Sequence, residues 1–491
     1  MAVVPIGRRI ADLAAADPER PAITFVGEGG LVRSVPRGEL DRRTNRLARA
    51  YAGLGAGQDD LVTITLPNGI EFYEAAIAIW TLGATPQPVS SRLPDRERLA
   101  IVDLAQPALV VGVEEGSHGG RRTVPAGFEA DPDLADTALP DAVAASWKAP
   151  TSGGSTGRPK LILAAQPGVV DVDAGPRYGM PSDGVQLVPG PLYHNSPFVF
   201  SMHGLFFGNQ LVVLGRFDAA LSLEMIERHR VDWVVLVPTM VHRIWRLPEE
   251  ERLARDVSSL RTVLHLAAPC PPWLKQAWID WLGVERICEL YGGTEAQAAT
   301  WITGPEWLAH RGSVGRFVSG EARILDPDGN DVPPGEVGEV FLRSTPGTGP
   351  TDRYLGAQPR ERDGWESLGD MGSLDADGYL YLADREADMI LAGGANVYPA
   401  EIEAGLDEHS LVRSSAVIGL PDDDMGQRIH AIIQLAGELG AAELRAHLAE
   451  RVVSYKIPRS FERVEQPLRD DAGKVRRSAL RHDRVPELGG A

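Results

Sequence analysis

The chain has 491 residues, of which 43% are hydrophobic and 24% charged, and its formal net charge is −19. One hydrophobic core rarely extends beyond roughly 250–300 residues, so we expect at least two domains. The acidic charge argues against a nucleic-acid partner, which clustered Lys and Arg would bind, and no apolar run reaches the ~18 residues of a membrane span.

The first part of the chain alternates between helical and strand patterns. Residues 1–20 have the pattern of a short amphipathic helix, and residues 39–55 and 71–84 also have helical spacing. Strands separated by helices are typical of parallel α/β layers, in which ligands bind at the carboxyl ends of the strands. Buried strands are predicted at 61–67, 107–113, 185–190, 210–215 and 231–238.

The pattern changes after residue 312. Short strands and turn dipeptides occupy residues 323–344, and an Asp-Gly hairpin follows in residues 374–385. These features predict a small antiparallel or barrel-like unit over 312–384.

A further unit begins after Arg385. It starts with a strand, a glycine turn and a helix, and continues with a strand at 415–421 and a helix at 443–452. We therefore predict an N-terminal domain at 1–385 and a smaller α+β domain at 386–491.

A glycine-rich and hydroxyl-rich segment, TSGGSTGRPK, gives the strongest chemical signal. Glycines let backbone N–H groups approach an anion, the hydroxyls add donors, and a lysine adds charge, which together suit a polyphosphate. The spacing is not that of a Walker loop, and by itself the segment also fits a polar linker. Its candidate phosphate-binding residues are Thr151, Ser152, Gly153, Gly154, Ser155, Thr156, Gly157 and Lys160.

Four shorter motifs follow in order. Tyr291-Gly292-Gly293-Thr294-Glu295 comes after a predicted strand, and Glu295 suits Mg²⁺, which favours one or two carboxylates with phosphate oxygens. The other motifs are Gly369-Asp370, Asp384-Arg385 with Gly393-Gly394 beyond it, and Gly473-Lys474.

In this order and separation, the motifs resemble the adenylate-forming superfamily of acyl-CoA synthetases, luciferases and peptide-synthetase adenylation domains. The resemblance covers residues 8 to 482. It implies a large N-terminal domain of two α/β layers with a β-barrel-like subdomain, and a mobile C-terminal domain. It also implies an AMP-forming acid-thiol ligase that uses ATP, Mg²⁺ and coenzyme A.

The resemblance also implies roles for single residues. Lys474 would bridge the substrate carboxylate and the α-phosphate, Thr294 would contact that phosphate, and Glu295 would bind Mg²⁺. Without the other motifs, Lys474 could be an exposed lysine, Asp370 a helix or turn cap, and Arg385 part of a surface ion pair. Asp370 would accept hydrogen bonds from the ribose with the help of Arg385. Adenine would be flanked by Tyr291, Ala267, Ala268 and Pro269, and the pantetheine arm by Gly393 and Gly394. The other cofactor-binding candidates are Gly292, Gly293 and Tyr381.

A mostly apolar set of residues is predicted to bind the acid. His194 would orient its carboxylate or gate the pocket, and no Asp is placed to pair with an α-amino group, which disfavours amino acids. The pocket candidates are Tyr193, His194, Asn195, Phe198, Met202, Val237, Pro238 and Ala268. The residues flanking the glycine-rich segment, Lys148-Ala149-Pro150 and Leu161-Ile162, are similar to those of bacterial bile-acid CoA ligases, which implies a polycyclic acid. Aryl and fatty acids are the alternatives.

Ala387 occupies the expected hinge, where related enzymes often have a polar residue. One alternative is therefore an enzyme that stops at acyl-AMP or that loads an acyl carrier protein. An alternative from a different class is a non-catalytic ATP-binding or acyl-binding protein. Two cysteines, Cys270 and Cys288, are too few for a disulfide framework, and the first residues lack the apolar core of a secretory signal. We expect a cytoplasmic protein, with a homodimer as one possible assembly.

Overall fold

The computed structural model describes residues 3–153, 159–392, 395–422, 425–470 and 473–485. The predicted residues Gly154, Ser155, Thr156, Gly157, Gly393 and Gly394 therefore lie outside the described residues. None of the helices in the described ranges is long and apolar enough to cross a bilayer.

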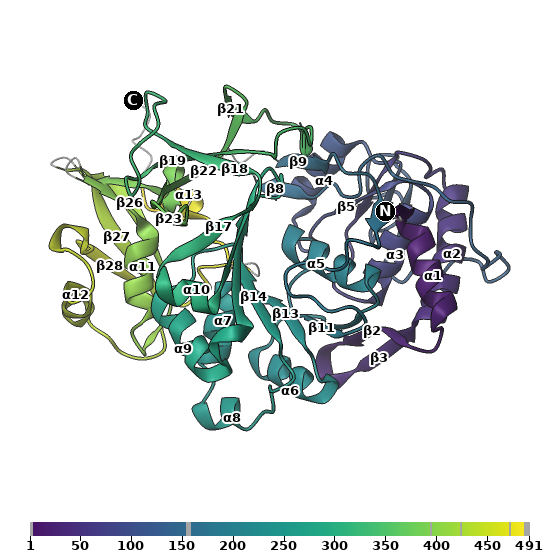
Figure 1. The fold of residues 1–491 in the computed structure, drawn as a ribbon, viewed down its shortest axis with the longest axis horizontal. Coiled ribbons are helices and arrows are strands. Elements are labelled where there is room, and N and C mark those ends of the chain that lie inside the picture. The colour runs from purple at the N-terminus through teal and green to yellow at the C-terminus, as the bar shows by residue number, and fades with distance from the viewer. Residues whose placement is uncertain (1–2, 154–158, 393–394, 423–424, 471–472, 486–491) are drawn as a thin grey trace.

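A parallel sheet forms the centre of the N-terminal domain (Figure 1). Successive residues of its strand β12 (Gln210–Leu214) enter different cores: Leu211 and Val213 pack on one face, and Val212 and Leu214 on the other. The parallel strands, in spatial order, are β15 (Ile287–Gly292), β14 (Thr262–Leu266), β13 (Trp233–Leu236), β11 (Val185–Val188), β12 and β2 (Pro21–Val26). Strand β3 (Val32–Pro36) pairs antiparallel with β2 at the edge.

A smaller parallel sheet forms a second α/β layer. Its order is β5 (Thr85–Pro88), β4 (Leu61–Ile64), β6 (Leu109–Val111) and β7 (Thr123–Val124). Helix α3 (Ile70–Thr81) is buried on all sides in the core that joins the two layers, which explains its lack of a polar face.

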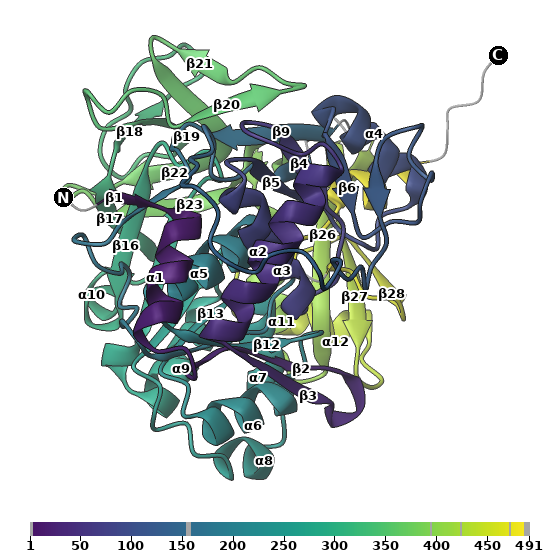
Figure 2. The same ribbon diagram turned by 90° about the vertical axis from the view of Figure 1, so that its right-hand side faces the viewer.

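Helices cover both faces of the large sheet. The first core includes α1 (Ile6–Ala16), α2 (Arg37–Gly53) and α5 (Asn195–Phe206), and Figure 2 shows α1 and α2 side by side. The second core is packed by α6 (Ala219–His229), α7 (Pro238–Trp245) and α9 (Pro272–Leu282). The remaining N-terminal elements are α4 (Asp95–Ala105), α8 (Glu249–Leu253), α10 (Gly304–Ala309), the pair β1 (Val3–Pro5) and β10 (Val169–Asp171), and the small sheet of β8 (Thr151–Gly153), β9 (Pro159–Ala164) and β20 (Asp352–Leu355).

The antiparallel unit predicted over 312–384 is present, but it continues the parallel sheet rather than standing apart from it. Strand β16 (Ala299–Thr303) pairs with β15 on one side and with β17 (Ser313–Ser319) on the other. The edge of the parallel sheet is thereby covered, as unpaired edges require. The series ends with β23 (Leu380–Arg385), β22 (Trp365–Leu374), β19 (Gly338–Arg343) and β18 (Glu321–Leu325), with β21 (Arg360–Arg362) beside β22.

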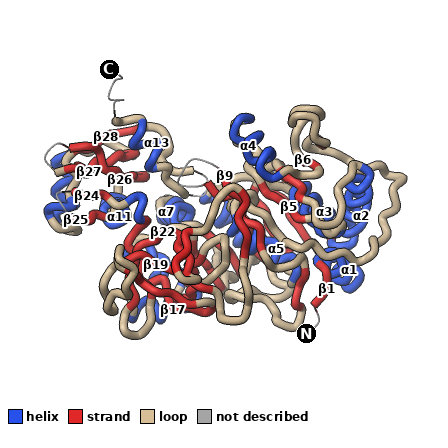
Figure 3. Tube along the Cα trace, turned by 90° about the horizontal axis from the view of Figure 1, so that it is seen from above, coloured by secondary structure: helices blue, strands red, loops and turns tan. Residues whose placement is uncertain are grey.

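The C-terminal segment has its own sheet and its own core at one end of the molecule (Figure 3). It follows the short helix η3 (Glu386–Asp388), which contains the predicted hinge residue Ala387. Its strands are β25 (Ala395–Val397), β24 (Ile390–Ala392), β27 (Gly426–Leu435), β26 (Val412–Asp422) and β28 (Ser460–Val464), and its helices are α11 (Pro399–Asp407), α12 (Ala441–Ala449) and α13 (Arg477–His482).

A buried ionic cluster holds this segment together. Glu403 of α11 is 5% exposed and accepts hydrogen bonds from Arg477 at 2.8 and 2.9 Å and from Arg469 at 3.0 Å. Arg477 also pairs with Asp388 of η3 at 2.8 Å. The two guanidinium groups hold the pKa of Glu403 below its usual value against the opposing effect of burial.

We expect Glu403→Gln to destabilise the C-terminal segment by about 3 kcal/mol, because two partly buried cations lose their shared anion. All Trp residues precede residue 386, so tryptophan fluorescence does not report on this segment. Hydrogen exchange of the β26 and β27 amides is therefore the measurement. Glu438→Gln is the control, because its side chain is 93% exposed. Equal exchange in the two variants would show that the cluster contributes nothing.

Candidate active site

A cleft of about 3110 Å³ lies between the N-terminal and C-terminal segments. The N-terminal segment contributes residues that follow the carboxyl ends of β13, β14 and β15, and the C-terminal segment contributes the stretch around Lys474. This is the edge of the parallel sheet at which the sequence predicts ligand binding.

Two loops at this edge contain non-glycine residues with left-handed backbone conformations. Ala267 follows β14 with φ +74°, and Ala296 follows Glu295 with φ +60°. Such conformations cost energy in residues with a Cβ, and they gather where function requires a particular backbone path. The predicted nucleotide-binding residues at this edge all line the cleft, namely Ala267, Ala268 and Pro269 after β14 and Tyr291, Gly292 and Gly293 at the end of β15.

Asp370 and Arg385 are brought together by the pairing of β22 with β23. They lie directly opposite each other in the register, with Arg385 Nε 3.3 Å from Asp370 Oδ1. The Tyr291 hydroxyl donates to the other oxygen, Asp370 Oδ2, at 2.8 Å. Burial and the Asp370 carboxylate raise the pKa of Tyr291, so its hydroxyl stays protonated. The three predicted nucleotide-binding residues thus form one hydrogen-bonded group that keeps acceptor oxygens at the cleft.

Glu295 is buried beside the predicted phosphate lysine. Its Oε1 accepts a hydrogen bond from the Tyr354 hydroxyl and lies 3.4 Å from Lys160 Nζ, which sits 4.4 Å from the centre of the Tyr354 ring. Burial and the nearby Glu366 and Glu295 carboxylates raise the pKa of Asp352 to about 7. This local excess of carboxylates suits a cation.

The geometry fits Mg²⁺ better than a metal held by the protein alone. Within the described ranges, no group of three or more His, Cys, Asp and Glu side chains surrounds a metal position. Mg²⁺ is commonly held by one or two carboxylates with phosphate oxygens and waters, so Glu295 would hold it together with a nucleotide. Thr151 Oγ1 and Ser196 Oγ are buried, and neither has a hydrogen-bond partner among the described residues, so both remain available to a ligand.

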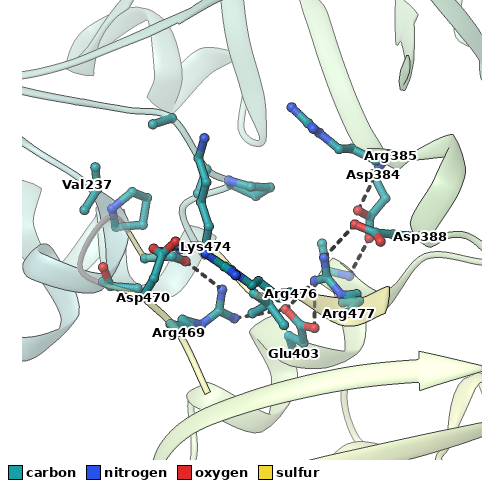
Figure 4. A pocket seen from close by; sticks show the side chains of 18 of the residues that line it. Val237, Asp384, Arg385, Asp388, Glu403, Arg469, Asp470, Lys474, Arg476 and Arg477 are labelled. Carbon is teal, nitrogen blue, oxygen red and sulfur yellow. Dashed lines mark hydrogen bonds and ion pairs between the residues drawn. The ribbon is translucent and has the colours of Figure 1, made fainter. Parts of the chain in front are cut away.

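Lys474 enters the cleft from the C-terminal segment (Figure 4). It extends into the space between Val237 and Arg385. Its enclosure in the cleft and the Arg385 charge lower its pKa, while Asp470 and Glu295 act in the opposite direction. The predicted convergence of Lys474 with Arg385 and Glu295 in a single cleft is therefore present in the structure.

Contacts around helix α7 help to hold the C-terminal segment in this position. Gly473 has φ +77°, and a Cβ at this residue would lie 2.5 Å from Thr239 Oγ1 in α7. Arg246, just after α7, donates to the carbonyl oxygens of Asp407, Ser410 and His409 at 2.9, 3.0 and 3.0 Å. Helix α7 thus contacts both the Lys474 turn and the end of α11.

The structure divides the predicted acid-binding residues into two groups. Tyr193, His194, Asn195, Val237, Pro238 and Ala268 line the cleft. Phe198 and Met202 are not among the residues that line it. Both are 0% exposed and lie in the first core, where the Phe198 ring packs 5.9 Å from Trp80. Residues one turn apart on α5 share a face, and this face is turned towards α3.

Tyr381 also differs from its prediction as a nucleotide-binding residue. Its hydroxyl donates to Asp375 at 3.2 Å, and it is absent from the residues that line the cleft in the described ranges. Sequence reasoning missed Tyr354, because its partner Glu295 lies far away in the chain. Lys148 enters the sequence analysis only as part of a flanking segment, because no local pattern indicates a role for it.

Comparisons with known proteins agree with this geometry. Residues 10–351 match the AMP-binding enzyme family, and residues 401–474 match the AMP-binding enzyme C-terminal domain. A feruloyl-CoA synthase from Amycolatopsis is 31% identical, with 94% of this chain and 96% of that protein covered. A sulfoacetate–CoA ligase from Cupriavidus necator is 30% identical, with 96% of each chain covered.

A solved structure is similar over the whole chain. The o-succinylbenzoate CoA synthetase from Bacillus subtilis, in complex with its acyl-adenylate intermediate, has a TM-score of 0.81 and 25% identity, with 99% of this chain and 100% of that chain covered. The large N-terminal and small C-terminal domains inferred from the sequence are therefore confirmed as the fold.

We expect Gly473→Ala to lower the rate of acid-dependent pyrophosphate exchange into ATP by about tenfold to a hundredfold. The added methyl group meets Thr239 and strains a left-handed residue, so Lys474 is displaced from the cleft. Gly426→Ala is the matched control: Gly426 also has a positive φ, +73°, but its added Cβ would meet only Leu391 O, at 4.0 Å. Unchanged exchange in Gly473→Ala would show that this contact does not position Lys474.

Proposed function

The chain belongs to the AMP-binding enzyme family, and we propose that it is an ATP-dependent acid–CoA ligase that acts on a hydrophobic, ring-bearing carboxylic acid. The observation that carries this proposal is the convergence of Lys160, Glu295, Arg385 and Lys474 on one cleft. A polyphosphate and a carboxylate repel each other. The three cations of this group offset that repulsion, and Glu295 would add Mg²⁺ to them.

The first proposed step joins the acid to the α-phosphate of ATP. A carboxylate oxygen attacks the α-phosphorus, the bond from that phosphorus to the bridging oxygen breaks, and pyrophosphate leaves with the electron pair. Charge builds on the phosphate oxygens, so fixed cations and N–H donors lower the barrier. Lys474 is assigned to the carboxylate and α-phosphate, Thr294 to the α-phosphate, and Lys160 with the glycine-rich segment to the departing phosphates.

The nucleotide itself is assigned to the hydrogen-bonded group at the sheet edge. Asp370 would accept hydrogen bonds from the ribose hydroxyls with Arg385 beside it, and Tyr291 with residues 267–269 would enclose the adenine. Mg²⁺ bound to Glu295 would offset phosphate charge.

The second proposed step transfers the acyl group to coenzyme A. The sulfur attacks the acyl carbon, the bond from that carbon to the phosphate oxygen breaks, AMP leaves, and the thiol proton passes to solvent. For this step we propose that the C-terminal domain turns about Ala387 so that residues 393–394 border the pantetheine arm. Free coenzyme A, rather than an acyl carrier protein, is the proposed acceptor, and the cytoplasm is the proposed location.

The acid is proposed to lie against the apolar wall of the cleft. Tyr193, Val237, Pro238, Met240 and Leu266 present mainly carbon atoms there, and such walls select hydrophobic ligands. Aryl acids are supported by relatives named for feruloyl, coumarate and 2-succinylbenzoate substrates. A polycyclic acid is the finer proposal, supported by the sequence around the glycine-rich segment.

A ligation screen tests the activity and the substrate class together. With ATP, Mg²⁺ and coenzyme A, we expect aryl or polycyclic acids to give a kcat/KM at least about tenfold above straight-chain fatty acids, because rings fill a wide apolar cleft better. AMP release and thioester absorbance are both followed. AMP release without thioester would contradict the ligase proposal, and a preference for fatty acids would contradict the substrate class.

A further inference from the structure

Lys148 is a buried lysine next to the cleft that the mechanism above does not use. It precedes β8 and is 5% exposed. Its Nζ donates to Asn195 Oδ1 at 2.6 Å and to the Thr294 carbonyl oxygen at 3.2 Å, and lies 5.6 Å from the centre of the Trp147 ring. It thus touches both the segment proposed to bind the acid and the segment proposed to bind the α-phosphate.

The charge of Lys148 is not neutralised by direct contact. Among the described residues, no carboxylate oxygen lies within 4.0 Å of Lys148 Nζ, the longest distance for an ion pair. Lys275, the other fully buried lysine, has such a partner: its Nζ lies 2.6 Å from Glu289. A buried charge without a counter-ion is unfavourable, so an anion that arrives with a ligand would offset part of that cost.

Other charges near Lys148 do not replace such an anion. Glu295 and Asp352 act on Lys148 from a distance, and burial outweighs them, so its pKa is lowered to about 8. His203, which packs 5.9 Å from Trp147, is neutral because burial lowers its pKa to about 4.

Lys148 also determines which way the Asn195 amide faces. An ammonium group can only donate, so the amide must present its oxygen to Lys148. The Asn195 NH₂ group is then turned away from Lys148, and no described residue accepts a hydrogen bond from it. Asn195 begins α5 and lines the cleft beside Ser196, whose buried hydroxyl also lacks a partner among the described residues.

Lys148 also acts on the peptide group that follows Thr294. Donation to its carbonyl oxygen polarises the peptide that joins it to Glu295, which strengthens the N–H of Glu295 as a donor. Lys148 therefore orients the NH₂ donors of Asn195 and strengthens the N–H donor of Glu295.

We propose that Lys148 and Asn195 form a second anion-positioning unit of the reaction centre, in which Lys148 orients the Asn195 amide towards the reacting carboxylate. Lys148 reaches this centre from the N-terminal domain, whereas Lys474 reaches it from the C-terminal domain. Lys148 is a positioning residue, and Asn195 is the group that contacts the acid. The inference rests on the proposed function, because it needs an acid and ATP in the same cleft.

Asn195→Asp is the sharpest test. The variant keeps the size of the side chain and an acceptor for Lys148, but it loses the NH₂ donors and pairs the lysine charge with a carboxylate. We expect kcat/KM for the acid in pyrophosphate exchange to fall on the order of a hundredfold, the scale of one lost donor at a charged transition state. KM for ATP should stay within about twofold. If Lys148 only braces the two segments, Asn195→Asp keeps its activity and the inference is wrong.

Lys148→Met separates a positioning role from a structural one. We expect kcat/KM for the acid to fall by a similar factor. The Tm should be equal to or above that of the wild type, because an apolar side chain replaces an uncompensated buried charge. A lowered Tm with unchanged kcat/KM would contradict the inference. Lys456→Met, which removes the charge of a lysine that does not itself line the cleft, should leave the exchange rate unchanged.

The double variant Lys148→Met, Asn195→Ala tests whether the two residues act as a unit. Its loss in kcat/KM for the acid should be close to the loss in Lys148→Met alone or in Asn195→Ala alone, since the Asn195 donors are lost or misoriented in each. Additive losses would contradict the inference. Absence of exchange in the wild type with every acid would instead overturn the proposed function, so the two failures are distinguishable.

Discussion

The architecture of this protein follows from the repulsion between two anions. A carboxylate and a triphosphate come together only where fixed positive charge and N–H donors outweigh that repulsion, and where water is largely excluded. The chain meets this need with lysines from distant parts of the sequence. Lys160 lies beside Glu295 at the N-terminal side of the cleft, and Lys474 enters from the C-terminal segment. In the proposed mechanism, neither cation is sufficient without the other.

The fold gives each of these groups a rigid support. The parallel strands β14 and β15 place Ala267 and Tyr291 at their carboxyl ends, and the antiparallel pairing of β22 with β23 sets Asp370 opposite Arg385. Contacts that hold the C-terminal segment include Gly473 against Thr239 and Arg246 at the end of α11. The Ala400 N–H also donates to Asp384 at 2.8 Å. In the proposed mechanism, the domain must break such contacts before it presents another face.

Much of the fold and the site could be predicted from the sequence, and the failures have physical causes. Residues 211–214 are apolar throughout because both faces of β12 are buried, and the strand predicted at 210–215 is confirmed. The motif residues around Glu295 and Lys474 are brought together as expected. The burial of Phe198 and Met202 was not predictable, because the face of α5 that meets the core depends on where α3 lies. Likewise, the role inferred for Lys148 depends on Asn195 and Thr294, which no local pattern connects to it.

The exchange of pyrophosphate into ATP by Lys474→Ala, measured with an accepted acid, tests the central claim most directly. If Lys474 offsets the repulsion between carboxylate and α-phosphate, exchange falls by at least about a hundredfold, while chemically prepared acyl-AMP is still converted to thioester by coenzyme A. Exchange at the wild-type rate would show that the C-terminal lysine takes no part in joining the two anions, and the account built on that convergence would be wrong.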